Sequence, residues 1–396
     1  MSIKTKTLDF ILILCVCLSV FSSDLYLSAL PKLMVTFESR SEQIQLTLSL
    51  YFVGFALSML LCAPLAKKLG NKKLILIGFS LYIMASLLCF FSQNLTIFII
   101  GRILQSFGGC CGSIVSRVIA KQTYSKPHRL SNLLSAMFLG MGLTTIIAPP
   151  LGSLFISYFD WRANFLFLAL FCLLLFVLIC LCIQNHTPEI SSTQSNIKEY
   201  FNIACDYNFR VYTSIITLGW ASFFTYLSST SFICINFFSL TTTNFSLFHS
   251  LAMIGFVLGS LLGRFFNKKT SPQILIHYSL IITLIGSSLL FIFSMSYAPN
   301  IFLFILPMFI LLFGIGLMLS FCQILAIQNI KQSINHAFSL MYFSKMIFGA
   351  FMGWVGVYLM KFNCLPMATV IILCSYIAFF INYFYVIKDN KISLVK

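Results

Sequence analysis

The stretch GFALSMLL (residues 54–61) decides the fold, because it recurs as GFVLGSLL at residues 255–262. Each copy lies within a long apolar run, and each is soon followed by the basic triplet NKK, at residues 71–73 and 267–269. The two copies occupy equivalent places in the two halves of the chain. Such an echo indicates a duplicated unit, in which the second half repeats the helices of the first half.

The composition is that of a protein that lies in a membrane. Apolar residues make up 59% of the 396 residues and charged residues only 9%, whereas a soluble domain carries about 25% charged residues. So few charges cannot cover an aqueous surface, which indicates a polytopic membrane protein. A spanning helix needs about 20 apolar residues. On that measure we expect twelve transmembrane helices, at residues 8–30, 43–65, 74–92, 96–118, 131–157, 164–183, 211–235, 246–265, 273–296, 301–327, 334–360 and 365–387.

The longest polar stretch, NHTPEISSTQSNIKEYFNIACDYNFR at residues 185–210, divides these spans into two sets of six. It predicts an N-terminal six-helix bundle over residues 1–184, a cytoplasmic linker over 185–210 and a C-terminal six-helix bundle over 211–396. The expected fold class is therefore an all-α membrane protein with twelve transmembrane helices in two bundles.

The positions of the basic residues predict which side of the membrane each loop faces. With the N-terminus inside, nineteen of the 25 Lys and Arg residues fall in cytoplasmic segments and four, Lys32, Arg40, Arg162 and Lys361, in outer ones. Cytoplasmic loops carry the excess of positive charge, so both termini are expected in the cytoplasm. Basic and aromatic residues do not interleave on a polar segment, which argues against a nucleic-acid partner despite the net charge of +16.

The sequence gives little support to a metal or catalytic centre. Most of the 14 cysteines lie inside apolar runs without a neighbouring His cluster, so we interpret them as small buried hydrophobes and expect no metal. A polytopic membrane enzyme, the alternative of another class, needs His, Asp or Glu gathered at one membrane face, and no such cluster is visible in the sequence. The sequence contains no phosphate-binding loop, which excludes an ATP-driven pump.

Six segments of the chain match the motifs of one family, in order and at the expected spans. They are SSDLYLSALP (22–31), IQLTLSLYFVGFAL (44–57), APLAKKLGNKK (63–73), GRILQSFGG (101–109), GMGLTTIIAPPLGSLF (140–155) and DWRANF (160–165). On these segments the chain resembles the major facilitator superfamily. Within it, the chain is similar to the drug:proton antiporters of the bicyclomycin-resistance (Bcr/CflA-like) type.

The resemblance implies a function and a location. Members of this group export small amphipathic compounds and drugs in exchange for protons, by alternating access between two six-helix bundles. It implies a monomer in the bacterial cytoplasmic (inner) membrane, with a small-molecule substrate, protons and lipid as partners and no cofactor beyond the proton gradient. Three alternatives stay open on the same scaffold: an exporter of an endogenous metabolite or siderophore, a nutrient importer, and a transporter that has lost its activity.

Two of the matching segments hold the residues that we expect to act in gating. These are Pro64, Lys67, Gly70 and Lys72 in the first loop motif, and Gly140, Gly142, Pro149, Pro150 and Gly152 in the fifth span. Small residues let helices approach closely and prolines remove backbone hydrogen bonds, which suits a moving seam as well as ordinary close packing. The chain departs from the family at charged positions, where it has Lys67 for an aspartate, Asn71 for an arginine and Lys121–Gln122 for an Arg–Asp pair.

Asp24 and Arg102 are expected to form a charge pair within the membrane. Asp24 is the only carboxylate deep inside an expected span, because Asp9 lies at the cytoplasmic mouth of the first one. A charge at such depth costs roughly 3 kcal/mol on insertion scales. It lies roughly 9 Å, and Arg102 roughly 10 Å, from the outer end of its span. The pair is either a structural ion pair or a proton-coupling site, at which Asp24 changes protonation as Arg102 or the substrate approaches and leaves.

Lys345 is the third charge that lies away from the ends of a span, roughly 16 Å from the cytoplasmic end. We expect it to face the interior, either as a structural cation or as a ligand for an anionic group of the substrate. The charges of Asp24, Arg102 and Lys345 sum to +1, which disfavours a simple organic cation as substrate. Other residues expected to line the substrate cavity are Tyr26, Gln105, Tyr226, Asn236 and Gln323, whereas His249, His277 and His336 are expected near span ends.

The charge distribution yields a testable topology. An alkaline phosphatase reporter, which folds only outside the cytoplasm, should be inactive when fused after Lys396 and active when fused after Lys361, in an outer loop. The reason is the excess of basic residues in the segments that we place inside. Phosphatase activity after Lys396 would show that the orientation is inverted.

Overall fold

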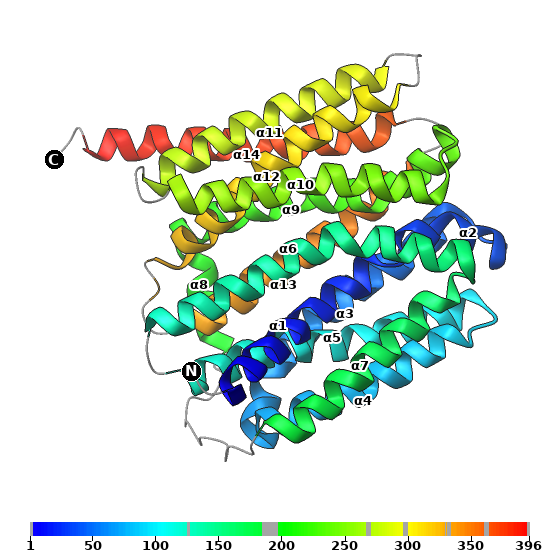
Figure 1. Cartoon of the computed structure of the whole chain (residues 1–396). Coiled ribbons are helices and arrows are strands. Elements are labelled where there is room, and N and C mark those ends of the chain that lie inside the picture. Colours follow the sequence, from blue (N-terminus) through cyan, green and yellow to red (C-terminus); the bar gives the residue numbers. More distant parts are fainter. Residues whose placement is uncertain are drawn as a thin grey trace. The chain divides into compact units, whose positions relative to one another are not determined.

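The structure, a computed structural model, describes residues 3–124, 127–183, 197–266, 271–295, 300–328, 330, 334–359 and 364–393. These residues form helices and short turns, and none of them belongs to a β-strand (Figure 1). Within this part, twelve helices are long and apolar enough to cross a membrane, which confirms the predicted fold class. Residues 185–196 of the expected linker lie outside the described residues.

The elements follow one another in two comparable series. The first half contributes α1 (Ile3–Asp24), η1 (Leu27–Ala29), α2 (Leu30–Thr36), α3 (Ser41–Leu69), α4 (Asn71–Phe90), α5 (Leu95–Thr123), α6 (Pro127–Tyr158) and α7 (Arg162–Cys182). The second half contributes α8 (Ile197–Cys205), α9 (Tyr207–Phe232), η2 (Ile233–Phe237), α10 (Thr242–Phe266), α11 (Pro272–Met295), α12 (Ile301–Ile327), α13 (Ile334–Tyr358) and α14 (Leu365–Ser393). Several helices run past the expected span, because helical hydrogen bonding continues beyond the apolar segment.

The chain divides into two compact units. Unit 1 comprises Met1–Thr193 with Thr241–Leu247, and unit 2 comprises Gln194–Leu240 with Phe248–Lys396. The first turns of α10 therefore group with unit 1, a division that the polar stretch in the sequence did not indicate. The domain boundaries inferred from the sequence stay a prediction.

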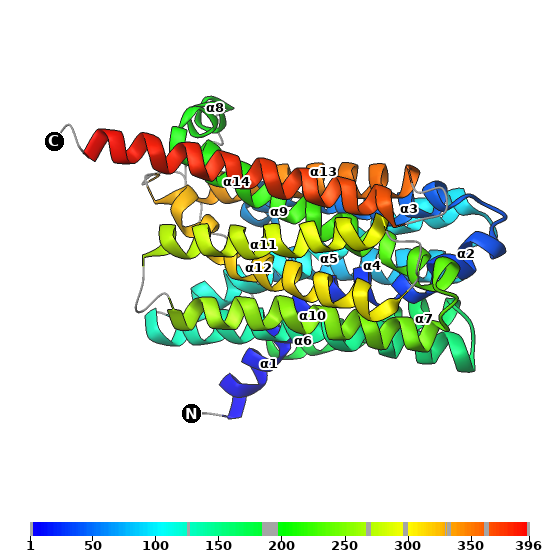
Figure 2. The ribbon, with the colours of Figure 1, turned by 90° about the horizontal axis from the view of Figure 1, so that it is seen from above.

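The two units repeat one pattern of helix neighbours. In unit 1, α1 packs against α5, α6 and α7, and α4 packs against α5 and α7. In unit 2, α9 packs in the same way against α12, α13 and α14, and α11 lies beside α12 and α14 (Figures 1 and 2). The first helix of each half thus contacts the fourth, fifth and sixth helices of its own half, as a duplicated unit should.

The repeated sequence motif performs the same packing task in each unit. A Cβ atom on Gly54 of α3 would meet the Ser106 side chain and the Ile103 carbonyl oxygen of α5. A Cβ atom on Gly255 of α10 would meet the carbonyl oxygen and ring of Phe309 on α12. Each motif therefore lets the second helix of a half approach the backbone of the fourth closely, as small residues do in membrane helix pairs.

The first span is discontinuous, which differs from the single helix expected over residues 8–30. The helix α1 ends at Asp24, residues Leu25 and Tyr26 form a turn, and η1 and α2 continue to Thr36. A Cβ atom on Gly152 of α6 would overlap the Leu25 carbonyl oxygen. The chain at the break therefore packs directly against α6, and only glycine fits at that point.

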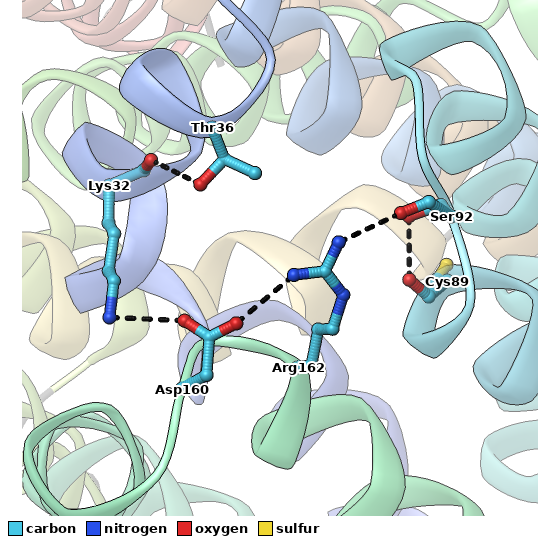
Figure 3. A network of polar contacts seen from close by, with 6 residues as sticks. All are labelled: Lys32, Thr36, Cys89, Ser92, Asp160 and Arg162. Atoms are coloured by element: carbon cyan, nitrogen blue, oxygen red, sulfur yellow. Dashed lines mark hydrogen bonds and ion pairs between the residues drawn. The ribbon is translucent and has the colours of Figure 1, made fainter.

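An ionic network holds one end of unit 1 together (Figure 3). Lys32 Nζ of α2 lies 3.0 Å from Asp160 Oδ1, and Arg162 Nη1 of α7 lies 3.1 Å from Asp160 Oδ2. Arg162 Nη2 also donates to the Ser92 carbonyl oxygen just beyond α4, at 3.2 Å. Partial burial raises the pKa of Asp160, but hydrogen bonds from Lys32, the Trp161 backbone and Arg162, with the Lys32 charge, outweigh burial and hold that pKa below its usual range.

Replacing Gly152 with alanine should destabilise the fold by about 1–3 kcal/mol, because the new methyl group meets a backbone carbonyl that cannot rotate away. Gly140→Ala is the matched control on the same helix. Its methyl group meets only the ends of the Ile13 and Cys17 side chains, at 2.9 and 3.1 Å, which can shift. Thermal unfolding in detergent should show a lower midpoint for Gly152→Ala alone. Equal midpoints for the two variants would contradict the close contact at Leu25.

The Asp160 network should stabilise the fold at neutral pH and not in acid. Because the pKa of Asp160 is lowered by folding, its contribution is present above the unfolded-state pKa of about 3.9 and is lost as pH falls through the folded-state pKa. The carboxylate is 37% exposed, so Asp160→Asn should cost at most about 1 kcal/mol at pH 7. The difference in unfolding midpoint should shrink as pH falls below about 3.9. Glu38→Gln, at an exposed carboxylate that joins no ion pair among the described residues, should show none. A difference that is independent of pH would refute this account.

Candidate functional site

Arg102 is fully buried in unit 1, on α5, where its guanidinium lies against aromatic rings. Its Cζ atom lies 4.2 Å from the Tyr26 ring centroid and 4.4 Å from the Tyr51 ring centroid. Tyr26 comes from the break after α1 and Tyr51 from α3. Each cation–π contact contributes about 0.5–2 kcal/mol when water is excluded, so the rings partly offset the cost of burying the charge.

A chain of hydrogen bonds continues from Arg102 across α5 and α4. Arg102 Nη1 donates to Gln105 Oε1, Gln105 Nε2 donates to Ser86 Oγ at 2.8 Å, and Ser86 Oγ donates to the Tyr82 carbonyl oxygen at 2.8 Å. The structure thus brings three predicted residues, Arg102, Gln105 and Tyr26, into one buried cluster. The Nε and Nη2 atoms of Arg102 are buried and have no hydrogen-bond partner among the described groups.

Asp24 does not form the ion pair with Arg102 that the sequence predicted. No oxygen of Asp24 lies within 4.0 Å of an Arg102 nitrogen, although both side chains are described. Instead the Asp24 carboxyl, 4% exposed, accepts a hydrogen bond from the Ser23 hydroxyl at 2.6 Å. The physical reason is that aromatic rings and Gln105 occupy the surroundings of the guanidinium. The role of Asp24 in proton coupling stays a prediction.

Lys345 of α13 is the buried cation of unit 2, with only 4% of its surface exposed. Its Nζ atom lies 4.4 Å from the Trp220 ring centroid on α9 and 3.9 Å from the Tyr342 ring centroid one turn earlier on α13. Gln323 Nε2 of α12 donates to the Tyr342 hydroxyl at 3.3 Å. Two predicted residues, Lys345 and Gln323, therefore belong to one cluster that Tyr342 connects.

The remaining cavity candidates of unit 2 have different positions. Tyr226 is buried on α9, and its hydroxyl lies 3.1 Å from Nδ1 of His249, whose ring is stacked on the Tyr226 ring. His249 is 2% exposed within α10, so its side chain is packed inside the protein, and its expected position near a span end stays a prediction. Asn236 is exposed in η2, beyond the end of α9, and does not join either cluster.

The predicted gating residues near the start of α4 form local contacts. Gly70 joins α3 to α4 with φ = 81°, a conformation that favours glycine. Lys72 Nζ donates to the Cys180 carbonyl oxygen of α7 at 3.0 Å. Pro64 is exposed within α3. Lys67 also lies in α3, but its side chain is outside the described part of the structure.

Two of the positions at which the chain departs from the pattern that it resembles contact each other. Asn71 Nδ2 donates to Gln122 Oε1 at 2.7 Å, which joins the start of α4 to the end of α5. Where the resemblance implies an arginine and an aspartate, this chain therefore has two neutral amides in hydrogen-bonding contact.

The fifth-span residues lie where α6 meets α1. Gly140 and Gly152 both face α1 or the break that follows it, and Pro149 and Pro150 lie inside α6 between them. Gly142 is half-buried on the same helix. The close packing predicted for this segment is present at both contact glycines, whereas its role in gating stays a prediction.

Sequence reasoning missed the aromatic residues that hold the two buried cations. Tyr51, Trp220 and Tyr342 carry no signal of their own among 16 tyrosines, 44 phenylalanines and 3 tryptophans. A usable signal was the buried cation itself, since a charge inside a span requires nearby groups that offset its burial. In the described part of the chain, no three His, Cys, Asp or Glu side chains are grouped as metal ligands.

Comparison with known proteins supports the same fold. The chain is 24% identical over 349 residues to the uncharacterized MFS-type transporter YdgK of Bacillus subtilis, covering 87% of this chain and 86% of that protein. It is 28% identical over 179 residues to the multidrug resistance protein MdtL of Escherichia coli, covering 44% and 45%. The crystal structure of a bacterial homologue of the human lysosomal transporter Spinster superposes with a TM-score of 0.78 at 12% identity, covering 98% of this chain and 98% of that one. The crystal structure of a D-xylose–proton symporter superposes with a TM-score of 0.77 at 12% identity, covering 94% of this chain and 97% of that one.

The family assignment rests on the match to a family model. The model of the Major Facilitator Superfamily matches residues 12–354, which is most of the chain. The twelve apolar helices and the solved structures of the same fold agree with that match. The chain therefore belongs to the major facilitator superfamily, and it is a multi-pass membrane transporter rather than an enzyme.

Proposed function

We propose that this transporter is a proton-coupled exporter of small amphipathic compounds in the bacterial cytoplasmic membrane, of the bicyclomycin-resistance (Bcr/CflA-like) group. One arrangement carries the proposal. Asp24, a buried carboxyl with no cation of the described residues within 4.0 Å, lies at the break of α1, two residues from Tyr26, whose ring covers the guanidinium of Arg102. Discontinuous helices with charged groups at the break are typical of substrate and ion sites in secondary transporters.

The chemistry of the arrangement supports an exchange of partners. A carboxyl group this deeply buried, with one hydroxyl donor and no cation among its described neighbours, is stable with a proton bound. Loss of that proton leaves a carboxylate that needs a cation, and Arg102 has two buried nitrogens that no described group accepts from. Movement of the break would bring the carboxylate to the guanidinium, so the protonation of Asp24 and the conformation of the first span depend on each other.

The charges also limit the class of substrate. The buried span residues include two cations, Arg102 and Lys345, and one carboxyl group, Asp24. Because the cations outnumber the carboxyl group, a neutral or anionic amphipathic molecule suits these charges better than a simple organic cation does. The partial similarity to MdtL supports a drug-like substrate, and the two cations favour as second candidate an anionic metabolite or siderophore.

The test is transport in inside-out vesicles with a pH-sensitive dye and a panel of substrates. Asp24→Asn should fold and insert, because removal of a buried ionisable group relieves desolvation. It should retain exchange of substrate down its own gradient but lose uphill transport driven by protons, because an amide cannot carry the proton. Glu38→Gln, a change at an exposed carboxylate outside the cluster, should transport like the parent.

A paired change at Arg102 separates coupling from structure. Arg102→Lys retains the charge and should retain more transport than Arg102→Ala, which leaves the Asp24 carboxylate without a cation when it ionises. Uphill transport by Asp24→Asn at the rate of the parent would refute proton coupling through this residue. Substrates that move only out of the inside-out vesicles, which is the direction of import into a cell, would exclude the exporter and favour the importer.

A further inference from the structure

Unit 2 contains an open cavity of about 490 Å³ between α8, α9, α13 and α14, with a mostly apolar wall that includes some polar residues. Its wall on α9 includes Arg210, Thr213, Ser214 and Thr217. These positions recur every three or four residues, so they share one face of the helix. The volume lies in the range of about 300–1,000 Å³ that is usual for pockets that hold small molecules.

The cavity changes from polar to apolar along α9. Arg210 is exposed in the first turn of the helix, and Leu218 lies eight residues further, roughly 12 Å deeper. On α13 the lining residues Leu340, Ser344 and Phe348 recur every four residues. The deeper wall is therefore built from Leu218 and Phe348, and its shape suits a molecule with one polar end and one apolar end.

Two hydroxyl groups of the cavity wall have no acceptor among the described residues. Thr213 is 8% exposed, and its Oγ1 atom has no hydrogen-bond partner in the described part of the chain. The same holds for the buried Oγ1 atom of Thr217. Arg210 forms no ion pair with any carboxylate that the structure describes, and the described lining residues include no Asp or Glu. Buried hydroxyl groups are normally hydrogen-bonded, so these atoms point to a missing acceptor.

The electrostatics of α9 favour an anion as that acceptor. A cation in the first turn of a helix is unfavourably placed, because the N-terminal end of a helix is itself positive. Asp206 caps this end by accepting a hydrogen bond from the Phe209 amide at 2.7 Å, but it forms no ion pair with Arg210. A ligand with several anionic oxygens would accept from Arg210 and from the threonine hydroxyls together, as phosphate groups do.

We propose that this cavity binds the phosphate headgroup of an anionic phospholipid. On the predicted topology, α9 begins at the cytoplasmic side, where the leaflet is rich in anionic lipid and where basic pockets between helices hold such headgroups. Arg210 contacts the phosphate, and the Thr213 hydroxyl donates to a headgroup oxygen. The lipid chain then follows Leu218 and Phe348. This assignment does not depend on the substrate or on proton coupling.

The experiment measures stabilisation of the purified full-length protein in a neutral detergent. The probes are dihexanoyl phosphatidylglycerol, dihexanoyl phosphatidylcholine and inorganic phosphate. Phosphatidylglycerol should raise the unfolding temperature of the parent at lower concentration than phosphatidylcholine does, and inorganic phosphate should have little effect. Because a hydrogen bond to a charged group is lost, Arg210→Gln should weaken apparent binding of phosphatidylglycerol about tenfold or more.

Matched variants separate the site from general charge effects. Lys68→Gln removes an exposed basic residue on α3 and should bind phosphatidylglycerol like the parent. Thr213→Val should weaken binding several-fold, whereas Thr213→Ser, which keeps the hydroxyl, should not. Unchanged binding by Arg210→Gln, or equal binding of the two lipids, would overturn the proposal. Equal stabilisation by inorganic phosphate would overturn the lipid as the source of the anion.

Discussion

The guanidinium of Arg102 is fully removed from solvent, and three other elements of unit 1 supply the groups that compensate it. The break after α1 supplies Tyr26, α3 supplies Tyr51 and α4 supplies Ser86, which holds Gln105 beside the charge. A charge in a low-dielectric interior is tolerated only when several neighbours act together. Burial of the Arg102 charge thus requires α1, α3, α4 and α5 at these relative positions. A shift of any one of these helices alters the surroundings of the guanidinium.

Unit 2 uses the same physical solution with different residues. Lys345 lies against Trp220 and Tyr342, as Arg102 lies against Tyr26 and Tyr51. The two cations differ in position along the fold, since Arg102 is on the fourth helix of its half and Lys345 on the fifth. Duplication therefore preserved the packing of the helices, seen at Gly54 and Gly255, while the two interiors acquired separate polar clusters.

The sequence was sufficient for the fold because its signals are long and redundant. Twelve apolar runs, the repeated GF motif and the basic clusters each report on many residues at once, so an error of a few residues does not change the result. The glycine contacts of α6 also followed from residue type, since small residues mark close helix approaches. Arg102 and Gln105 were found because a polar side chain inside a span has few explanations.

The details of the site could not be read from the sequence because they depend on competition between neighbours. Equal depth made Asp24 the apparent partner of Arg102, yet aromatic rings and an amide surround the guanidinium in the structure. The break after Asp24 was also unforeseen, because Leu25 and Tyr26 are ordinary residues within an apolar run. What fixes the break is its contact with Gly152, more than a hundred positions later in the chain.

The amide contact between Asn71 and Gln122 gives this chain a distinct physical character where the family uses charges. An ion pair at an exposed position weakens as ionic strength rises, because mobile ions screen it within about 10 Å at 0.1 M salt. A hydrogen bond between two neutral amides is not screened in this way. The link between α4 and α5 should therefore keep its strength as the salt concentration changes, a form of osmotic robustness that an ion pair at this place would not have.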